Sequence, residues 1–529
     1  MEADSIIETL LKNRGLKTKK AVEEFFSPTR PENLKSPFDS ASAIRLIKSH
    51  IKKGHKIAIY GDYDVDGICS TAILWETLYT DYKNVFPHIP HRESEGYGLS
   101  IKGIDHCLEQ GAKLIIAVDN GIVAHDQIKY CRKHTCDIII IDHHEATSQR
   151  PEANCILHST SCCAAALAWF FCRDYLLTPN SELLSLVAIA TICDIVPLLG
   201  VNRSFAKYGL EELNHTTRPG LLALFREAGL SPNSCLLTPY HLGFIIGPRI
   251  NAMGRLEHAI DSLRLLCTHK LDQATQLAKL LGETNKLRQD ETRSSVDHAL
   301  GTLDENNLPD MIIVSDTGYH PGVIGLIAGK LTEKHHRPCV AISIGETESK
   351  ASCRSVSGFH ITDHLRQYGD LLVAVGGHAM AAGFTVSNLN LPKLLKKLTE
   401  TKIDPKILKK KQRVDAKIPL TAIDQKLIAR LKEFEPFGLG NPTPIFSSLR
   451  VEISDIRKLG KLGQHLKFKA GDLEAIWFNV PSPSLTSQDA SRRLDLREGL
   501  GVSYDLTYQV EENIWNGQSN LQLTIKSLD

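Results

Sequence analysis

The sequence predicts an α/β protein: a parallel sheet flanked by helices, a second and smaller α/β domain, and a C-terminal all-β module. Three observations lead to this prediction. Short runs of Ile and Val alternate with helical patterns early in the chain, the same alternation returns after a long stretch of helical periodicity, and the last part alternates with a period of two. A chain of 529 residues is also too long for a single hydrophobic core.

Three short apolar runs in the first part read as strands: "KIAIYG" (56–61), "KLIIAV" (113–118) and "DIIII" (137–141). Helical patterns lie between them, such as "KGIDHCLEQG" and "HDQIKYCRKH". Strands that alternate with helices indicate βαβ units, and unbroken Ile and Val runs indicate strands that are buried on both faces. We therefore expect one parallel sheet, with ligands bound beyond the carboxyl ends of its strands.

Three aspartates follow the first strand at alternate positions, in "GDYDVDG". Asp62, Asp64 and Asp66 would share one face if this segment is extended, because the side-chain period of a strand is two. Carboxylates so close together repel one another unless a cation binds them. The spacing therefore predicts a cation site at this end of the strand.

Acidic and imidazole side chains also follow the next two strands. Asp119 comes directly after the second strand, and His143 and His144 come after the third. Asp194 interrupts the apolar helix in "ATICDIVPL", where a buried carboxylate needs a partner. We expect these groups to converge with the three aspartates. Carboxylates with imidazoles favour Mn²⁺ or Mg²⁺, and their number favours two ions that clamp a phosphoryl group during hydrolysis.

Taken one at a time, these motifs have simpler explanations. A D-x-D or D-N-G sequence is common in turns, and a His-His pair is often structural. The metal hypothesis depends on the set, because each motif stands at the end of a predicted strand.

Composition excludes several other classes of protein. The formal net charge is +1, so nucleic-acid binding would need local basic patches. The 13 cysteines are scattered and form no C-x-x-C pair, which favours reduced, buried thiols in the cytoplasm over a zinc site or disulfides. The longest apolar stretch, "LLSLVAIATICDIVPLL", contains Asp194 and Pro197, which favours a buried helix and no membrane partner.

The strand-end motifs resemble those of the DHH phosphoesterase superfamily: "GDYDVDG", "VDNG", "IDHHEA" and "ATICDIVPL". Further motifs resemble the RecJ family of single-strand-specific exonucleases: "HRESEGYGLS", "GFIIGPRINAMGRL", "YHPGVIGLIAGKL", "ASCRSVSGFH", "VGGHAMAAGFTV" and "FEPFGLGNPTPIF". Together they span nearly the whole chain. The resemblance implies a DHH domain with a parallel sheet, a smaller α/β domain called DHHA1, and an OB-fold domain.

The resemblance also implies roles for particular residues. Catalysis would depend on Asp62, Asp64, Asp66, Asp119, His143, His144 and Asp194, of which all except His144 are expected to bind metal. By analogy, Asp119 would bridge the two ions and Asp64 would bind one of them. The other ion would be bound by Asp66, His143 and Asp194. Asp62 and His144 are expected to orient these ligands or to bind transiently.

Substrate binding is assigned in part by the same resemblance. Arginines in the family motifs would hold phosphates, since planar guanidinium groups do this well, whereas a surface salt bridge is the alternative for any single arginine. The basic stretch "RKLGKLGQHLKFK" (457–469), with Lys461 and Phe468 in it and Trp477 nearby, suits an OB-fold that follows a single strand, or else a solvated face. The expected substrate-binding residues are Arg92, Tyr97, Arg255, Ser352, Arg354, His378 and Lys467.

The expected domain boundaries follow from these patterns. Residues 1–268 would hold an N-terminal segment and the DHH domain, 269–304 a connecting helix, 305–402 the DHHA1 domain, and 403–529 the OB-fold domain. The helix is predicted from a stripe of Leu and Ala at helical spacing with no Pro in 269–300. A turn at Asn516-Gly517 is expected between the last two strands.

The function expected from the resemblance is 5′-to-3′ degradation of single-stranded DNA to 5′-mononucleotides in repair and recombination. Single-strand-binding protein and a helicase are expected partners. Two alternatives remain open from the sequence. One is a phosphodiesterase of short oligoribonucleotides or cyclic dinucleotides, which would need no strand-tracking module. The other is a non-catalytic DNA-binding relative, which would not need the full set of ligands.

Overall fold

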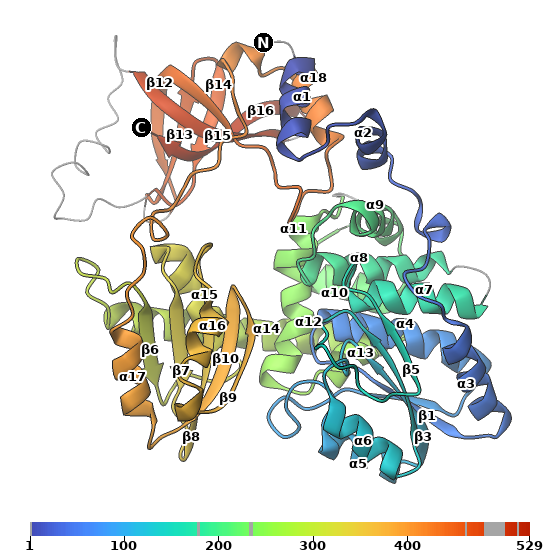
Figure 1. The fold of residues 1–529 in the computed structure, drawn as a ribbon. Helices are drawn as coiled ribbons and strands as arrows, with labels where there is room; N and C mark the ends of the chain where they lie inside the picture. The colour runs from blue at the N-terminus through green and yellow to red at the C-terminus, as the bar shows by residue number, and fades with distance from the viewer. Residues whose placement is uncertain are drawn as a thin grey trace. The chain divides into compact units, whose positions relative to one another are not determined.

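The chain folds into two compact units. Its helices and strands are labelled in Figure 1. The computed structural model describes residues 3–176, 180–231, 236–460, 463–480, 503–515 and 518–528. The larger unit comprises residues 36–194 and 209–411, and the smaller unit comprises residues 1–35, 195–208 and 412–529.

A five-stranded parallel sheet lies at the centre of the first part of the larger unit, with the strand order β2-β1-β3-β4-β5. Its strands are β1 (Lys56–Tyr60), β2 (Val85–His88), β3 (Ala112–Val118), β4 (Asp137–Asp142) and β5 (Cys155–His158). The three central strands are almost entirely buried, as their unbroken apolar runs predict. The expected parallel sheet is thus confirmed, and it gains two short edge strands that were not expected.

Helices cover both faces of this sheet. The chain runs outward from β1 to β2 through α4 (Val65–Asp81) and then back to β3 through α5 (Ile101–Glu109), so right-handed crossovers place these helices on opposite faces. The face with α5 also carries α6 (His125–Lys133). The remaining helical elements of this part are α3 (Ala41–Lys52), α7 (Ala164–Leu176), η2 (Ser181–Leu183), α8 (Leu184–Cys193), α10 (Pro219–Glu227), α11 (Pro239–His241), η3 (Leu242–Ile246), α12 (Gly247–Leu256) and α13 (Ile260–Cys267).

The long helix α14 (Leu271–Gly301) joins this part to a second sheet. It packs against α10, α12 and α13 and also against α15 (Ile324–His335) of the second part. The second sheet has the order β6-β7-β8-β10-β9 and is mostly antiparallel. Its elements are β6 (Ile312–Asp316), β7 (Cys339–Ser343), β8 (Glu348–Arg354), α16 (Ile361–Arg366), η4 (Gly369–Leu371), β9 (Leu372–His378), β10 (Ala381–Ser387) and α17 (Leu391–Thr399). None of the helices in the described ranges is both long enough and apolar enough to cross a membrane.

The smaller unit is built on a closed ring of strands. The strands follow the order β12-β13-β14-β16-β15 around the ring, which closes through pairing of β12 with β15. The short strand β11 pairs with the start of β12. The elements after residue 411 are β11 (Ala416–Lys417), η5 (Leu420–Ala422), α18 (Gln425–Lys432), β12 (Phe446–Leu459), β13 (His465–Ala470), β14 (Leu473–Trp477), β15 (Ser503–Trp515) and β16 (Gln518–Leu528). This ring confirms the expected all-β module. Lys461 and the expected turn at Asn516-Gly517 lie outside the described residues.

The N-terminal segment also belongs to the smaller unit. Its elements are α1 (Ala3–Asn13), α2 (Lys19–Phe26) and η1 (Pro31–Asn33). The apolar face of α1, with Ile6 and Leu10, lies in one hydrophobic core with Leu427 and residues of the ring. The sequence grouped these residues with the first sheet, and the difference arises because an amphipathic helix does not specify which core it joins.

A third segment, residues 195–208, completes the smaller unit. Arg203 in this segment is 1% exposed, and its guanidinium group lies 3.8 Å from the centre of the Phe25 ring. It donates hydrogen bonds to the carbonyls of Phe25 at 2.6 Å and of Glu435 at 2.9 Å. The helix α9 (Gly200–Asn214) begins here and ends in the larger unit.

Candidate metal centre and cleft

The three aspartates after β1 occupy a loop and the start of a helix. Asp62 lies in the loop, Asp64 is the N-cap of α4 and accepts a hydrogen bond from the amide of Gly67 at 3.0 Å, and Asp66 is in the first turn of α4. The expectation of one extended segment was therefore wrong. Helix formation from Val65 onward turns the chain, so Asp66 reaches a different set of neighbours from those of Asp62 and Asp64.

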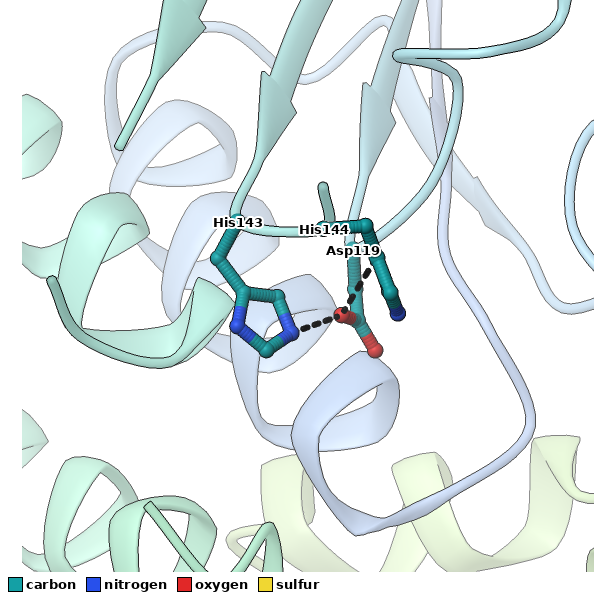
Figure 2. Close-up of side chains that lie close together, drawn as sticks. All are labelled: Asp119, His143 and His144. Carbon is teal, nitrogen blue, oxygen red and sulfur yellow. Dashed lines mark ion pairs between the residues drawn. The ribbon is translucent and has the colours of Figure 1, made fainter. Parts of the chain in front are cut away.

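Asp119 and the two histidines come from the ends of β3 and β4 (Figure 2). Asp119 has a φ of 63°, which is left-handed backbone. Its Oδ1 lies 3.2 Å from His143 Nε2 and 4.0 Å from His144 Nδ1. The carboxyl ends of adjacent parallel strands thus bring these side chains together, as the sequence predicted.

The structure brings all seven predicted catalytic residues together in three overlapping groups whose ligand atoms are close enough to share a metal ion. Within each group, the ligand atoms lie within 4.8 Å of one another. One group is Asp62, Asp64 and Asp119, the second is Asp66, His143 and Asp194, and the third is Asp119, His143 and His144. Asp119 and His143 each belong to two groups, so the three form one continuous centre.

Other parts of the larger unit fix the ligands in place. Two backbone amides at the start of α7, those of Ala164 and Ala165, donate to the Asp66 carboxylate at 2.7 and 2.8 Å. Asp194 is the C-cap of α8, and its Oδ2 lies 3.8 Å from His143 Nδ1. The two amide contacts hold the Asp66 carboxylate in place, and the C-cap position brings the Asp194 carboxylate close to His143.

The electrostatics of the centre favour a bound cation. Burial and neighbouring carboxylates raise the pKa of Asp62, Asp66 and Asp119 above the usual range, and they raise the pKa of Asp194 to about 8. Among the described residues, no hydrogen-bond partner satisfies either buried oxygen of Asp62 or Oδ1 of Asp119. A cation would satisfy these oxygens, and oxygen with imidazole ligands suits Mn²⁺ or Mg²⁺. The residues present therefore fit divalent metal ions.

A cleft of about 730 Å³ opens beside Asp64, between the first part of the larger unit and its second sheet. Loop and helix residues from the first part and strand residues from the second line it, among them Arg92, Tyr97, Arg255, Ser352 and Arg354. Arg255 Nη1 donates to the carbonyl of Gly322 at 3.0 Å, and Arg354 Nη1 donates to Ser352 Oγ at 3.2 Å.

The arginines of the cleft act on one another. Burial lowers the pKa of Arg255 to about 10, and the positive charges of Arg92, Arg288 and Arg354 act in the same direction. The Arg92 guanidinium lies 5.1 Å from the centre of the Tyr63 ring. Clustered guanidinium groups beside a carboxylate centre suit an anionic ligand such as a phosphodiester.

Known proteins with similar sequences share this whole organisation. Family models match three regions: the DHH family, N-terminal domain over residues 56–191, the DHHA1 domain over 309–403, and the RecJ OB domain over 414–527. The single-stranded-DNA-specific exonuclease RecJ of Bacillus subtilis (strain 168) is 32% identical over 546 residues, which cover 98% of this chain and 67% of that protein. The chain belongs to the RecJ family. RecJ of Escherichia coli (strain K12) is 27% identical over 572 residues, which cover 100% of this chain and 96% of that protein.

A solved RecJ structure has the same fold. RecJ from Thermus thermophilus in complex with Mn²⁺ matches with a TM-score of 0.82 and 26% sequence identity, over 99% of this chain and 76% of that one. A structure of the Thermus protein in complex with Mg²⁺ matches with a TM-score of 0.75. The α/β fold expected from the sequence is thereby confirmed.

Two residues that the RecJ resemblance assigned to substrate binding are not among the residues that line the cleft. His378 is exposed at the end of β9 and is not among the lining residues. Lys467 is on β13 of the smaller unit, where its ammonium group lies 3.0 Å from Glu474. The other five expected substrate-binding residues line the cleft.

Asp142, the first residue of the triplet that gives the DHH superfamily its name, was not expected from the sequence to have a role. Asp142 is 1% exposed, and its Oδ1 accepts a hydrogen bond from His144 Nδ1 at 2.7 Å. Burial opposes ionisation of Asp142, but the hydrogen bond and charge of His144 outweigh it and lower the pKa of this carboxyl. Burial likewise opposes protonation of His144, and Asp142 outweighs it and raises the pKa of His144 to about 9. Asp142 thus orients His144, which its position at the very end of β4 could have indicated.

Proposed function

We propose that this chain is a metal-dependent exonuclease that degrades single-stranded DNA. The observation that carries this proposal is the complete carboxylate and histidine centre, which opens directly onto an arginine-lined cleft in a member of the RecJ family. Relatives of that family are named as single-stranded-DNA-specific exonucleases.

We assign the residues of the centre as the resemblance implied. Asp119 would contribute to both metal sites, Asp64 to one, and the group of Asp66, His143 and Asp194 to the other. Asp62 and His144 would orient the ligands, and Asp142 holds the His144 ring in its orientation through its hydrogen bond. When bound, the two ions supply Lewis acidity and offset negative charge on the phosphodiester.

The chain's own residues position the strand. Arg92, Arg255 and Arg354 hold phosphates in the cleft, together with Ser352 and Tyr97. An anion that binds between these guanidinium groups reduces their mutual repulsion, and this reduction adds to the affinity of the cleft for phosphate. We propose that degradation runs 5′ to 3′ and releases 5′-mononucleotides. His378 and Lys467 contact the strand outside the cleft.

The wider setting also belongs to this proposal. The enzyme would act in DNA repair and recombination, and a helicase or single-strand-binding protein would supply the single strand. Twelve cysteines in the described ranges are free thiols, nine of them buried, which suits the reducing cytoplasm.

Digestion of end-labelled oligonucleotides tests the proposal. Single strands, duplexes, ribo-oligonucleotides and cyclic dinucleotides are compared with Mn²⁺, with Mg²⁺ and with chelator. Metal-dependent loss of single-stranded DNA from its 5′ end is the expected result. Preference for short ribo-oligonucleotides or cyclic dinucleotides would replace the proposed substrate class. Binding without cleavage under every metal condition would assign the chain to the non-catalytic alternative.

A further inference from the structure

One loop carries three of the side chains that line the cleft, those of Arg92, Glu93 and Tyr97. It runs over residues 89–100, between β2 and α5. Arg92 and Tyr97 from this loop line the cleft, where Arg92 lies over the ring of Tyr63 and the Tyr97 hydroxyl lies 2.9 Å from His144 Nε2. The loop thus contacts both the phosphate-binding side of the cleft and the metal centre.

Glu95 of the same loop is not among the cleft-lining residues, and its side chain is only 11% exposed. Its Oε2 accepts a hydrogen bond from His88 Nε2 at 2.9 Å, and its Oε1 accepts one from the backbone amide of His91 at 3.0 Å. One carboxylate therefore ties the end of β2 to the residue that directly precedes Arg92.

The surroundings of Glu95 are shaped to receive it. His88 packs against Tyr60, with ring centres 4.7 Å apart, and the Tyr60 hydroxyl donates to the carbonyl of Gly98 at 3.1 Å. A Cβ on Gly103 of α5 would lie 2.7 Å from Glu95 Oε2 and 2.2 Å from the Tyr60 hydroxyl. Only glycine at this position leaves room for the two anchors together.

The anchors bracket the functional side chains. Glu95 fixes the backbone just before Arg92, and Tyr60 fixes the backbone just after Tyr97. The two glycines in this loop, Gly96 and Gly98, have φ values of 87° and 69°. A loop with left-handed glycines on both sides of Tyr97 would lose its conformation readily if the anchors were absent.

We infer that Glu95 is a positioning residue: it holds the 89–100 loop so that Arg92 and Tyr97 face the phosphodiester and the metal centre. This inference rests on the proposed exonuclease function. The ionised state of Glu95 is favoured, because hydrogen bonds from His88 and His91 outweigh the effect of burial and lower its pKa. Glu95 acts through Arg92 and Tyr97 and does not itself touch the substrate.

The test compares Glu95→Ala and Glu95→Gln in the full chain, with Glu109→Gln at the exposed end of α5 as the matched control. For Glu95→Ala we expect KM for single-stranded DNA to rise roughly tenfold, since removing a group that orients functional side chains typically costs ten- to a hundredfold. Glu95→Gln keeps the acceptor for the His91 amide and should recover part of this loss. The control should behave like wild type.

A double-mutant cycle separates positioning from a general structural role. On an Arg92→Ala background, Glu95→Ala should raise KM much less than it does in wild type, because the side chain that it positions is already gone. Fluorescence anisotropy of a labelled single strand in chelator should show the same pattern for Kd, without turnover. The Mn²⁺-induced rise in Tm should remain in every variant.

Each outcome of these experiments either supports or overturns the inference about Glu95. An equal rise in KM on both backgrounds, or no rise in wild type, would overturn the inference. So would loss of the Mn²⁺-induced Tm shift in Glu95→Ala and Glu95→Gln together, since it would show collapse of the centre. If Glu95→Ala does not fold, the cycle is run with Glu95→Gln. If wild type itself binds DNA but does not cleave it, the proposed function fails, and the anisotropy cycle still tests the loop.

Discussion

Removal of metal should make stability depend on pH through Asp194. Its pKa is about 8 in the folded protein, because burial and the charges of Asp66 and Asp64 disfavour the anion. In the unfolded chain the carboxyl ionises near its ordinary value of 3.8. A raised folded-state pKa of an aspartate means that stability is lost as pH rises from about 4 to about 8.

The size of the effect follows from the shift. Between pH 5 and pH 8 the loss has an upper limit of about 4 kcal/mol, at about 1.4 kcal/mol for each pH unit. The other carboxylates of the centre share this proton binding, and Asp194 is 24% exposed, so we expect about 2 kcal/mol from Asp194 itself. For a unit of about 360 residues, with an unfolding entropy of about 2.1 cal/mol/K per residue, that corresponds to a fall in Tm of roughly 3 °C.

Scanning calorimetry in chelator at pH 5 and pH 8 measures this effect for wild type and for Asp194→Asn. The fall in Tm from pH 5 to pH 8 should be smaller in the variant, by the fall assigned to Asp194 above, because asparagine has no carboxyl group that must ionise at this site. Saturating Mn²⁺ should largely abolish the fall in wild type, since the cation favours the ionised form. The reasoning is refuted if the fall in chelator is the same for both proteins.

Four further predictions follow from the same contacts. Asp119→Asn, which suits left-handed backbone, should keep the fold by circular dichroism but lower kcat by more than about a hundredfold; normal turnover would exclude a bridging ligand at this position. Mn²⁺ at a hundred times its Kd should stabilise wild type by about 2.7 kcal/mol, and the shift in Tm should be smaller for Asp64→Asn; equal shifts would place the ion elsewhere. Lys467→Ala should reduce the salt slope of binding to long single strands by about 0.7, measured by anisotropy across a KCl series, and an unchanged slope would remove this lysine from the interface. Arg203→Met leaves buried carbonyls unpaired and should cost about 3 kcal/mol in urea unfolding, whereas an unchanged midpoint would contradict the role of these hydrogen bonds.

The central elements of the fold could be predicted because their patterns are long and regular. The strand expected at 113–118 is β3 (Ala112–Val118), and the helix expected over 269–300 is α14 (Leu271–Gly301). The edge strands β2 and β5 were missed because each has four residues, and β2 contains Pro87. So short a run shows no period that separates a strand from a loop.

The site was predictable in its members but not in all of its geometry. The ends of adjacent parallel strands must meet, which is why Asp119 and His143 could be paired from sequence alone. Asp66 was expected on the same extended face as Asp62 and Asp64, but it lies in a helix. The sequence signal for this helix start is Asp64, an aspartate just before a helical apolar run, which is typical of an N-cap. Asp142 and Glu95 act through other side chains, and no spacing in the sequence reveals such partners.

Each unit is built from separated segments of the chain, and this limits how the protein can evolve by recombination. The larger unit is interrupted directly after Asp194, the chain spends residues 195–208 in the smaller unit, and it then returns through α9. Neither unit is therefore encoded by one uninterrupted stretch of gene. A recombination event that moves residues 412–529 alone would leave behind the other two segments of the smaller unit, 1–35 and 195–208, so the strand ring cannot be transferred with its complete core as one contiguous segment.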